Sequence, residues 1–488
     1  MAIIAGLDIG TTGTKLSAYR SDGSFLCSAY REYNVKREGG FHEVDAEQIF
    51  SAVLEVLGEV GSSHAIDAIG ITSFGETFVA LDENDRAILP AMLYTDVRGE
   101  EECAELIEKL GEDRITEIAG VYPHSMYSLP KLMWIKKQRP AAYQQIKHVL
   151  LMGDYVTYML TGEACITHSL AARTMAFDIR KKQFSRDILD AAGVDASLFA
   201  KPVDPFTVVG EIKPSLAEQL GIAKGTKIVA GAHDQVAAAV GAGILEPGCA
   251  MDGAGTVECI VPLFDEFPDA KALSSGRYPI VPYVFPDTYV TYAFSFTGGA
   301  SLKWYRDKLS AEKKYSVLDA SVKDAPSEIL VMPHFSGAAT PYMDTGSKAA
   351  FIGLTLAHDN ADIYKALMEG VAYEAKLNLE RLSEAGIRPK KMYATGGGAS
   401  EVWLGIKADI WQCDLVALEA GEVGACGACM IAGTATGVYK DLFEAKRLFV
   451  KEKKSYLPNG AKTKRYAQLY EAYKDIYTAV RPITEKIK

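Results

Sequence analysis

The stretch IIAGLDIGTTGTK, residues 3–15, decides the fold, because it joins an apolar run of strand length (residues 3–9) to a loop of glycine and threonine. A second strand-like segment, residues 14–20, follows the loop at once, and after a Ser-Asp-Gly-Ser turn comes a third, residues 25–33. No helical pattern separates these segments. We therefore predict that the chain opens with an antiparallel hairpin and not with a β-α-β unit.

Helical and strand-like patterns alternate after this hairpin. A helix is predicted over residues 46–60, where Asp45 and Gln48 have the spacing of a capping box. Strands are predicted over residues 66–72 and 78–81. This alternation predicts a mixed α/β protein.

Glycine and proline interrupt the chain near its middle, at residues 246–248. They follow a strand predicted over residues 227–231 and a helix of small residues over residues 233–241. We place a domain boundary here, with an N-terminal domain over residues 1–245 and a C-terminal domain over residues 246–488.

The C-terminal half opens much as the N-terminal half does. Residues 250–261 are predicted as strand, turn and strand, and their MDGAGT run at 251–256 loosely repeats DIGTT at 8–12. Two halves that each begin with a glycine-threonine turn between strands indicate a duplicated architecture with a cleft between the domains. The last fifty residues are rich in lysine and helical in pattern, which is typical of a solvated helix face.

Composition excludes several classes of protein. The chain has 488 residues, of which 48% are hydrophobic and 24% charged, as in ordinary folded proteins with more than one core. Lys and Arg number 52 against 63 Asp and Glu, so a long basic surface for nucleic acid or an anionic membrane is not expected. The eight cysteines are scattered and the N-terminus lacks a signal pattern, which indicates a cytoplasmic protein.

The first glycine-threonine turn has the features of a phosphate and metal site. Its glycines let backbone N–H groups approach an anion, the hydroxyls of Thr11 and Thr12 add donors, and Asp8 at the strand end could hold a hydrated Mg²⁺. Lys15 is followed by Leu16 and by a strand, so the run is not a Walker A loop. The alternative is a plain hairpin turn with a solvated aspartate; the similar turn at residues 253–256 favours phosphate binding.

Asp234 is the candidate catalytic base. It stands between an apolar strand and a helix of small residues, where a carboxylate facing a cleft can accept a proton from a substrate hydroxyl. The alternative is that Asp234 is an N-cap residue that satisfies backbone donors. For His233, beside it, we expect a structural role.

Two further motifs lie in the C-terminal half. The triple glycine at residues 396–398, between a strand at 391–393 and a helix at 401–411, would let an adenine or its ribose lie against bare backbone. Cys426 and Cys429 fall in a helix of small residues with no histidine nearby, so we expect close helix packing and no zinc.

Taken together and in this order, the motifs resemble those of the FGGY family of carbohydrate kinases, within the actin-like and chaperone-like ATPase architecture. MYSLPKLMWIKKQ, residues 126–138, fits the first family signature, and AAFIGL, residues 349–354, with DIYKALMEG, residues 362–370, fits the second. GAATPY, residues 337–342, is similar to the family loop before the second signature.

The resemblance implies an α/β protein of two ribonuclease H-like domains flanking a central cleft, with sugar mostly on the first domain and Mg-ATP mostly on the second. It implies that Asp234 is the general base and that Asp8 is the carboxylate associated with Mg²⁺. The ATP contacts expected on this ground are Thr11, Thr12, Lys15, Gly255, Thr256, Gly299, Lys303, Gly397 and Gly398. The family often carries an asparagine shortly after the triple glycine. Residues 399–402 of this chain contain no asparagine. Homodimers are frequent in the family, so a homodimer is expected by analogy.

The acceptor segment of the family falls at residues 73–77, SFGET. At the position of Gly75-Glu76, typical xylulokinases have Met-His and glycerol kinases have Arg-Glu. The Ser-Phe-Gly run of this chain is similar to the corresponding run in kinases of deoxyketoses. Asp234-Gln235 is similar to glycerol kinases, and Tyr94 begins a run that resembles a family Trp-x-Asp-x-Arg motif. The acceptor-binding residues expected are Phe74, Gly75, Glu76, Tyr94, Asp234 and Gln235.

We expect a neutral or near-neutral ketose or polyol of about four to six carbons, because a carboxylate acceptor calls for a bidentate arginine that Gly75 cannot supply. A pentulose such as xylulose is the single acceptor favoured; a deoxyketose or a polyol of the glycerol or tetritol type is the alternative. Glu76 has an alternative too, as an outward charge at a strand end. A further alternative is an actin-like or chaperone-like ATPase without a sugar acceptor.

Overall fold

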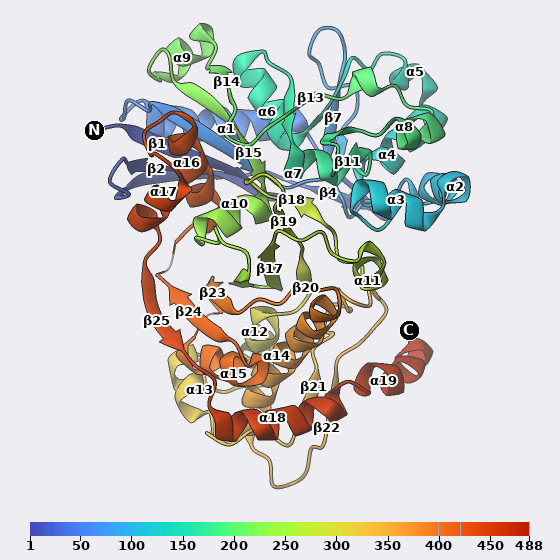
Figure 1. Cartoon of the computed structure of the whole chain (residues 1–488), viewed down its shortest axis with the longest axis vertical. Helices are drawn as coiled ribbons and strands as arrows, with labels where there is room; N and C mark the ends of the chain where they lie inside the picture. The colour runs from blue at the N-terminus through green and yellow to red at the C-terminus, as the bar shows by residue number, and fades with distance from the viewer. Residues whose placement is uncertain (399, 420, 488) are drawn as a thin grey trace. The chain divides into compact units, whose positions relative to one another are not determined.

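The computed structural model describes residues 1–398, 400–419 and 421–487, with the backbone alone at residue 270. Its elements are labelled in Figure 1. The chain forms two compact units. The first consists of residues 1–245, 280–289 and 422–450, and the second of residues 246–279, 290–421 and the chain from 451 onward.

The first unit is built on a sheet that begins with the predicted hairpin. Strands β1 (Ile3–Ile9) and β2 (Gly13–Arg20) pair antiparallel, and β3 (Phe25–Glu32) pairs antiparallel with β2. The prediction of an antiparallel opening is therefore confirmed. The other strands of this sheet, in the order β14-β15-β6-β1, are β6 (Ala68–Ser73), β14 (Val208–Glu211) and β15 (Lys227–His233).

The second unit repeats this pairing scheme. Strand β16 (Cys249–Ala254) pairs antiparallel with β17 (Glu258–Phe264) and parallel with β23 (Lys391–Thr395). In the same way β1 pairs antiparallel with β2 and parallel with β6. The duplicated architecture expected from the two glycine-threonine turns is thus present in the strand topology.

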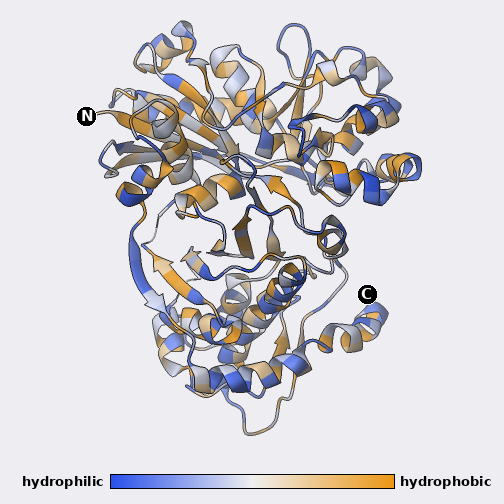
Figure 2. Cartoon of the chain, viewed as in Figure 1, coloured by the Kyte–Doolittle hydropathy of each residue, from blue (hydrophilic) through white to orange (hydrophobic). Residues whose placement is uncertain are grey.

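The second sheet ends in an edge strand that differs in character from its neighbour. Strand β24 (Asp414–Leu418) is apolar, whereas β25 (Glu452–Tyr456), which pairs antiparallel with it, carries the charged run EKKSY (Figure 2). Lysine on an edge strand opposes pairing with another chain. Besides the strands named above, the structure has shorter strands, of which β20 (Ala293–Ser295) pairs antiparallel with β17. The others are β4 (Lys36–Glu38), β5 (Phe41–Val44), β7 (Phe78–Leu81), β8 (Ala91–Met92), β9 (His148–Leu151), β10 (Cys165–Thr167), β11 (Phe177–Asp178), β12 (Gln183–Phe184), β13 (Lys201–Val203), β18 (Val281–Pro282), β19 (Tyr289–Val290), β21 (Leu330–Met332) and β22 (Ala350–Ile352).

Helices accompany both sheets. Those of the first unit are α1 (Ala46–Gly61), α2 (Glu100–Leu110), α3 (Glu112–Ala119), α4 (Ser128–Gln138), α5 (Pro140–Tyr143), α6 (Met152–Thr161), α7 (His168–Ala171), α8 (Arg186–Ala192), α9 (Pro214–Leu220), α10 (Asp234–Gly241), α16 (Val423–Ala435) and α17 (Leu442–Phe449). Those of the second unit are α11 (Ala270–Ser275), α12 (Gly299–Lys308), α13 (Tyr315–Ser321), α14 (Asn360–Glu384), α15 (Glu401–Trp411), α18 (Gly460–Tyr473) and α19 (Ile476–Thr484). In the described part of the chain, none of these helices is long and apolar enough to cross a membrane.

Helices α10 and α16 pack backbone against backbone in the first unit. A Cβ atom on Gly427 would lie 1.8 Å from the carbonyl oxygen of Ala237, and one on Gly6 would lie 1.8 Å from that of Ala425. Only glycine permits such an approach. Cys429 is buried in the same helix, with its Sγ 3.5 Å from the carbonyl oxygen of Ile4, so the small-residue helix predicted here is confirmed.

The start of α1 differs from the prediction in one contact. Asp45 is the N-cap residue, as expected, and its side chain accepts a hydrogen bond from the N–H of Glu47 at 2.9 Å. Gln48, however, accepts from the N–H of Asn34 at 3.3 Å. The capping box is therefore not formed, because the neighbouring segment supplies a competing backbone donor.

Candidate active site

Asp8 lies at the end of β1, where the glycine-threonine turn begins. A hydrogen bond of 2.9 Å from the N–H of Gly10 to the carbonyl of Gly13 closes this turn. The first turn of α16 lies against Asp8, since a Cβ atom on Gly424 would be 2.6 Å from its Oδ2. Burial raises the pKa of Asp8 to about 6, and the negative charge of Glu422 adds to the rise. Asp8 is thus a carboxylate that a cation would stabilise in its charged form.

The other predicted residues of this turn lie at its surface. Thr11 is half-buried and Thr12 exposed. The Nζ of Lys15 is 2.7 Å from Glu422 Oε1, in an ion pair that is partly open to solvent. A nucleotide phosphate would have to compete with Glu422 for this lysine.

Asp234 is the first residue of α10 and not its N-cap, which is His233. The N-cap position predicted as the alternative is therefore wrong, although the Asp234 carboxylate does accept from a backbone donor, as that alternative expected. Its Oδ1 accepts from the N–H of Gln235 at 2.6 Å and lies 3.3 Å from His233 Nε2, and a third of the side chain (34%) is exposed. Burial raises the pKa of Asp234 to about 7, with further contributions from the charges of Asp8 and Glu76. A base with this pKa is matched to proton transfer near neutral pH.

His233 lies beneath Asp234 as a neutral side chain. Burial, helped by the charge of Arg173, holds the pKa of His233 well below its ordinary value. Its backbone N–H donates to Ser169 Oγ at 3.1 Å. These contacts fit the structural role expected for His233.

Glu76 is buried, with 5% of its surface exposed, so its interpretation as an outward charge is wrong. It follows β6 and adopts a left-handed backbone with φ of 63°. Its Oε1 accepts from Arg173 Nε at 2.7 Å and also from the terminal nitrogen Nη2 of the same guanidinium. The guanidinium thus supplies the opposite charge beside a carboxyl group at a buried position.

Arg173 was not predicted from the sequence. It comes from the short helical turn Ala172–Thr174, almost a hundred positions from Glu76, and is 5% exposed. The missing side chain of Gly75 makes room for it, since a Cβ atom on Gly75 would lie 2.8 Å from Arg173 Cγ. The guanidinium also lies over the ring of Tyr127, 5.2 Å from its centroid. No sequence motif around residue 173 predicts this contact.

Residues of the first signature support the acceptor segment. Ser128 Oγ donates to the carbonyl of Glu76 at 2.6 Å. Lys131, fully buried, donates from Nζ to the carbonyl oxygens of Asp96 at 2.9 Å and Arg98 at 3.2 Å. Helix α4 therefore holds both the loop of Glu76 and the run that begins at Tyr94.

The predicted acceptor residues fall into two groups. Burial and the charges of Glu76 and Asp234 raise the pKa of Tyr94, which indicates that these three side chains share one region of the first unit. Gly75 lies against the same region, and Gln235 is half-buried beside Asp234. Phe74, in contrast, is almost fully buried and belongs to the core.

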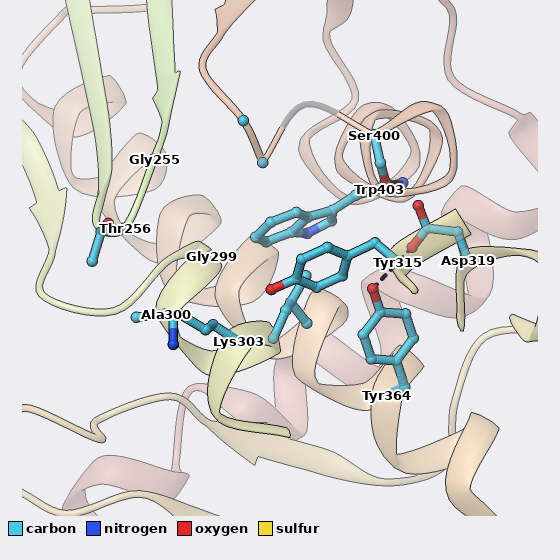
Figure 3. A pocket seen from close by; sticks show the side chains of 13 residues that line it. Gly255, Thr256, Gly299, Ala300, Lys303, Tyr315, Asp319, Tyr364, Ser400 and Trp403 are labelled. Carbon is cyan, nitrogen blue, oxygen red and sulfur yellow. Dashed lines mark hydrogen bonds between the residues drawn. The ribbon is translucent and has the colours of Figure 1, made fainter. Parts of the chain in front are cut away.

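The second unit contains a cavity of about 420 Å³. Six of the residues predicted to contact ATP line it together, as Figure 3 shows in part: Gly255, Thr256, Gly299, Lys303, Gly397 and Gly398. The remaining three predicted ATP contacts, Thr11, Thr12 and Lys15, belong to the first unit. Glycine turns and a cavity of this size fit a nucleotide.

The glycine turns around the cavity are tied to one another. The N–H of Gly299 donates to the carbonyl of Gly255 at 2.8 Å, and that of Gly398 donates to the carbonyl of Ala254 at 2.8 Å. Gly396 has a φ of 92°, and a Cβ atom there would lie 2.6 Å from the carbonyl oxygen of Ala254. The turn between β16 and β17 is thus the common support of the other two loops.

Aromatic side chains form the other wall of the cavity. The rings of Tyr315 and Trp403 face the space between the loops, and Tyr364 Oη donates to Asp319 Oδ1 at 2.9 Å (Figure 3). Trp403 is fixed by a hydrogen bond of 3.0 Å from Nε1 to the carbonyl of Met368. The sequence offered no motif for these residues. Flat rings are suited to stacking against a nucleotide base.

A cluster of three charged side chains lies buried behind this cavity. Lys407 of α15 contacts Asp252 of β16, with Nζ 2.9 Å from Oδ2, and also Glu258 of β17. Burial and the charge of Asp252 raise the pKa of Glu258 to about 8. The cluster joins the helix after the triple glycine to the strands that carry the glycine-threonine turn.

The chemistry of Asp8 fits a magnesium ion. Mg²⁺ commonly takes one or two protein carboxylates and completes its shell with water and phosphate oxygens. Within the described ranges no group of three or more metal-ligating side chains is assembled. Asp8, whose pKa is raised and which lies near Glu422, would provide one carboxylate ligand. One protein carboxylate is enough for a magnesium ion that binds together with a nucleotide, because phosphate oxygens and water complete its shell.

The paired sheets and the glycine-lined cavity define a two-domain, mixed α/β protein of the actin-like ATPase fold. The model of the FGGY family of carbohydrate kinases, N-terminal domain, matches residues 3–241, and the C-terminal domain model matches residues 270–436. The chain belongs to the FGGY family of carbohydrate kinases and is a phosphotransferase with an alcohol group as acceptor.

Relatives match over the whole length of the chain. A xylulose kinase of Bacillus subtilis (strain 168) is 27% identical over 498 aligned positions, which cover 100% of this chain and 99% of the relative. Two crystal structures from Lactobacillus acidophilus are similar to this chain: one is of a ligand-bound xylulose kinase and the other of a gluconate kinase. Each match covers 100% of this chain and 100% of the other chain. Their TM-scores are 0.93 and 0.92, at 24% and 23% identity. At such identity these two structures support the fold alone.

Proposed function

We propose that this protein transfers the terminal phosphoryl group of ATP to a hydroxyl of a neutral pentulose such as xylulose, with Asp234 as the general base. The single observation that carries the proposal is the geometry of Asp234: its carboxylate stands at the start of α10, a third of it is exposed, and the N–H of Gln235 holds it at 2.6 Å. The raised pKa of Asp234, about 7, supports this role. The match of a xylulose kinase along the whole chain supports the choice of acceptor.

The nucleotide is assigned to the cavity of the second unit. Backbone N–H groups of the glycine turns would hold its phosphates, while the exposed ring of Tyr315 would hold the base and the buried Trp403 would support the wall of the cavity. Lys303 lies at the cavity, with its Nζ in an ion pair with Asp307 at 2.6 Å. The glycine turns therefore carry most of the phosphate contacts in this proposal.

Asp234 would accept the proton of the acceptor hydroxyl as that oxygen attacks phosphorus. The N–H of Gln235 and the nearby His233 would hold the carboxylate in position through its Oδ1. Asp8 would hold Mg²⁺, which neutralises phosphate charge when bound. Because phosphoryl transfer needs positioning more than covalent chemistry, no further nucleophile is required.

The acceptor proposal rests on the charge of the Glu76–Arg173 pair. A carboxylate acceptor calls for an arginine free to bind it in a bidentate manner, yet both bonds of Arg173 described above go to Glu76. A deoxyketose or a small polyol remains the alternative acceptor, since either presents hydroxyls without charge.

Formation of ADP in the presence of a panel of pentuloses, deoxyketoses, polyols and aldonates tests the proposal. We expect the highest kcat/KM with a pentulose. ATP hydrolysis that none of these acceptors changes would contradict it and would favour an ATPase without a sugar acceptor.

A further inference from the structure

We propose that the buried Glu76–Arg173 pair is the charge filter of the acceptor site. The carboxylate of Glu76 neutralises the positive charge of Arg173, and the kinase therefore rejects anionic acceptors. This inference rests on the proposed function, because it assigns acceptors to the region of Asp234. It deepens that function by making the charge of Glu76 the feature that decides between neutral and anionic acceptors, so that removing this charge should change the preference.

The pair is placed where an acceptor would meet it. Glu76 and Arg173 both act on the titration of Asp234, the glutamate raising and the arginine lowering its pKa, so both lie close to the proposed base. Gly75 leaves the space that Arg173 fills, and His233 lies on the other side of this space, with its Cδ2 2.9 Å from a Cβ atom at residue 75. The pair therefore forms part of the wall around Asp234.

The pair is also built for charge cancellation. Two nitrogen atoms of Arg173 bind one oxygen of Glu76, and both side chains are almost fully buried. Tyr127 covers the guanidinium face, and Ser128 fixes the backbone of Glu76. An arginine held in this way is not free to grip a carboxylate in a bidentate manner.

The sum of charges around the site then disfavours an anion. The arginine and the glutamate cancel, His233 is neutral, and Asp234 contributes a negative charge once it acts as a base. A carboxylate acceptor would be brought into a site whose net charge is negative, whereas a hydroxyl can donate to Glu76 Oε2 or to Asp234.

Glu76→Gln tests the filter most sharply. The substitution keeps the shape of the side chain but removes the negative charge, so that Glu76 no longer neutralises Arg173. Two pairs of acceptors differ only at C1, where one member has an alcohol and the other a carboxylate: xylitol with xylonate, and glucitol with gluconate. We expect the ratio of kcat/KM for the anionic member to that for the neutral member to rise by about tenfold or more. Where an aldonate is not turned over, its inhibition constant against a pentulose replaces kcat/KM.

Controls separate this effect from loss of stability. Glu102→Gln removes a buried glutamate of α2 whose nearest cation, Lys137 Nζ, is 3.8 Å away, and it should leave the ratio unchanged. If Glu76→Gln does not fold, Arg173→Met carries the test: it removes the positive charge, and inhibition by aldonates should weaken relative to binding of the polyols.

The outcomes distinguish the inference from the proposed function. A wild-type enzyme that phosphorylates neutral acceptors, with the same ratio in Glu76→Gln, overturns the charge filter but leaves the function standing. A wild-type enzyme that prefers aldonates over their alcohols also overturns the filter. Absence of acceptor-dependent ADP formation with every compound overturns the proposed function itself.

Discussion

The reactivity proposed for Asp234 comes from its surroundings rather than from its residue type. An ordinary aspartate is a weak base at neutral pH, but burial and the charges of Asp8 and Glu76 raise its pKa to about 7. The first turn of α10 holds the carboxylate through Gln235. A carboxylate of this kind titrates in the range where the enzyme is expected to work.

The pH dependence of turnover follows from this pKa. A general base must be deprotonated, so kcat/KM for the acceptor should be constant above pH 7 and should fall by about tenfold per unit well below it. A pH profile of ADP formation measures this. An acid limb centred near pH 4, the range of an ordinary aspartate, would contradict the role of Asp234.

Gly75 is required because Arg173 occupies the space of a side chain. In Gly75→Ala the new Cβ atom would lie 2.8 Å from Arg173 Cγ and 2.9 Å from His233 Cδ2. We expect a loss of about 1–3 kcal/mol in the free energy of unfolding and a higher KM for the acceptor, as Arg173 is displaced from Glu76.

Urea denaturation and acceptor kinetics measure the two effects of this substitution. Gly397→Ala is a suitable comparison for the stability effect, since no atom lies within 4 Å of a Cβ placed there. A Gly75→Ala variant with unchanged stability and KM would show that the arginine is not confined by residue 75.

Close packing of α10 against α16 sets the position of Asp234 at the element scale. The two helices approach until a Cβ atom on Gly427 would lie 1.8 Å from the carbonyl oxygen of Ala237. Because the obstructing atoms belong to the backbone, no rotamer change can relieve the overlap. The start of α10 is thus held by a contact that only glycine allows.

Gly427→Ala should therefore destabilise the protein by about 3 kcal/mol, near the upper end of the usual range for overpacking. Gly405→Ala in α15 is the matched control: it also adds a methyl group inside a helix, but no atom lies within 4 Å of it. That control should be neutral or stabilising by up to about 1 kcal/mol, because alanine favours helix. Equal effects in both variants would contradict the account of the packing.

The buried cluster of Lys407 joins α15 to β16 and β17. Lys407→Met leaves the acidic side chains of Asp252 and Glu258 buried without the cation that both contact, which should cost about 3–5 kcal/mol of stability. Denaturation monitored by tryptophan fluorescence measures this. A variant as stable as the wild type would show that the cluster contributes nothing net.

The pH dependence of stability has a definite sign at this cluster. The pKa of Glu258 is about 8 in the folded protein against an ordinary 4.5, so the folded state binds the extra proton. Its contribution to stability therefore falls as pH rises between these values and levels off above about pH 8. A contribution that increases with pH in this window would contradict the assignment, and Glu258→Gln should flatten the dependence.

Elements whose signals are local could be predicted from the sequence. The hairpin at residues 3–20 has contiguous strands and a glycine turn, and the helix predicted over residues 401–411 has the bounds of α15. The Gln48 contact could not be predicted, because its competing donor, Asn34, comes from another segment.

At the site, the glycine turns could be predicted but the aromatic wall and Arg173 could not. Glycine turns carry a backbone requirement that is visible in the sequence. Tyr315 and Arg173 act through contacts with segments far away in the chain, which no spacing encodes. The same holds for Lys407, whose partners lie about 150 positions earlier.

At the scale of the whole molecule, the residues proposed for acceptor chemistry and those proposed for nucleotide binding belong to different units. The first holds Asp8, Asp234 and the Glu76–Arg173 pair, and the second holds the cavity proposed for the nucleotide and the buried cluster of Lys407. Each unit repeats one strand topology, with its glycine-threonine turn at the same place. Nucleotide binding and proton abstraction should therefore be separable by mutation.

Asp234→Asn, compared with the wild type for both ATP binding and acceptor-dependent ADP formation, tests the central claim most directly. We predict that ATP binding, measured by calorimetry, is unchanged, because the nucleotide cavity lies in the other unit. Turnover of a pentulose should fall by about 10²- to 10⁴-fold, the usual contribution of a general base. Near-native turnover in Asp234→Asn would contradict the claim.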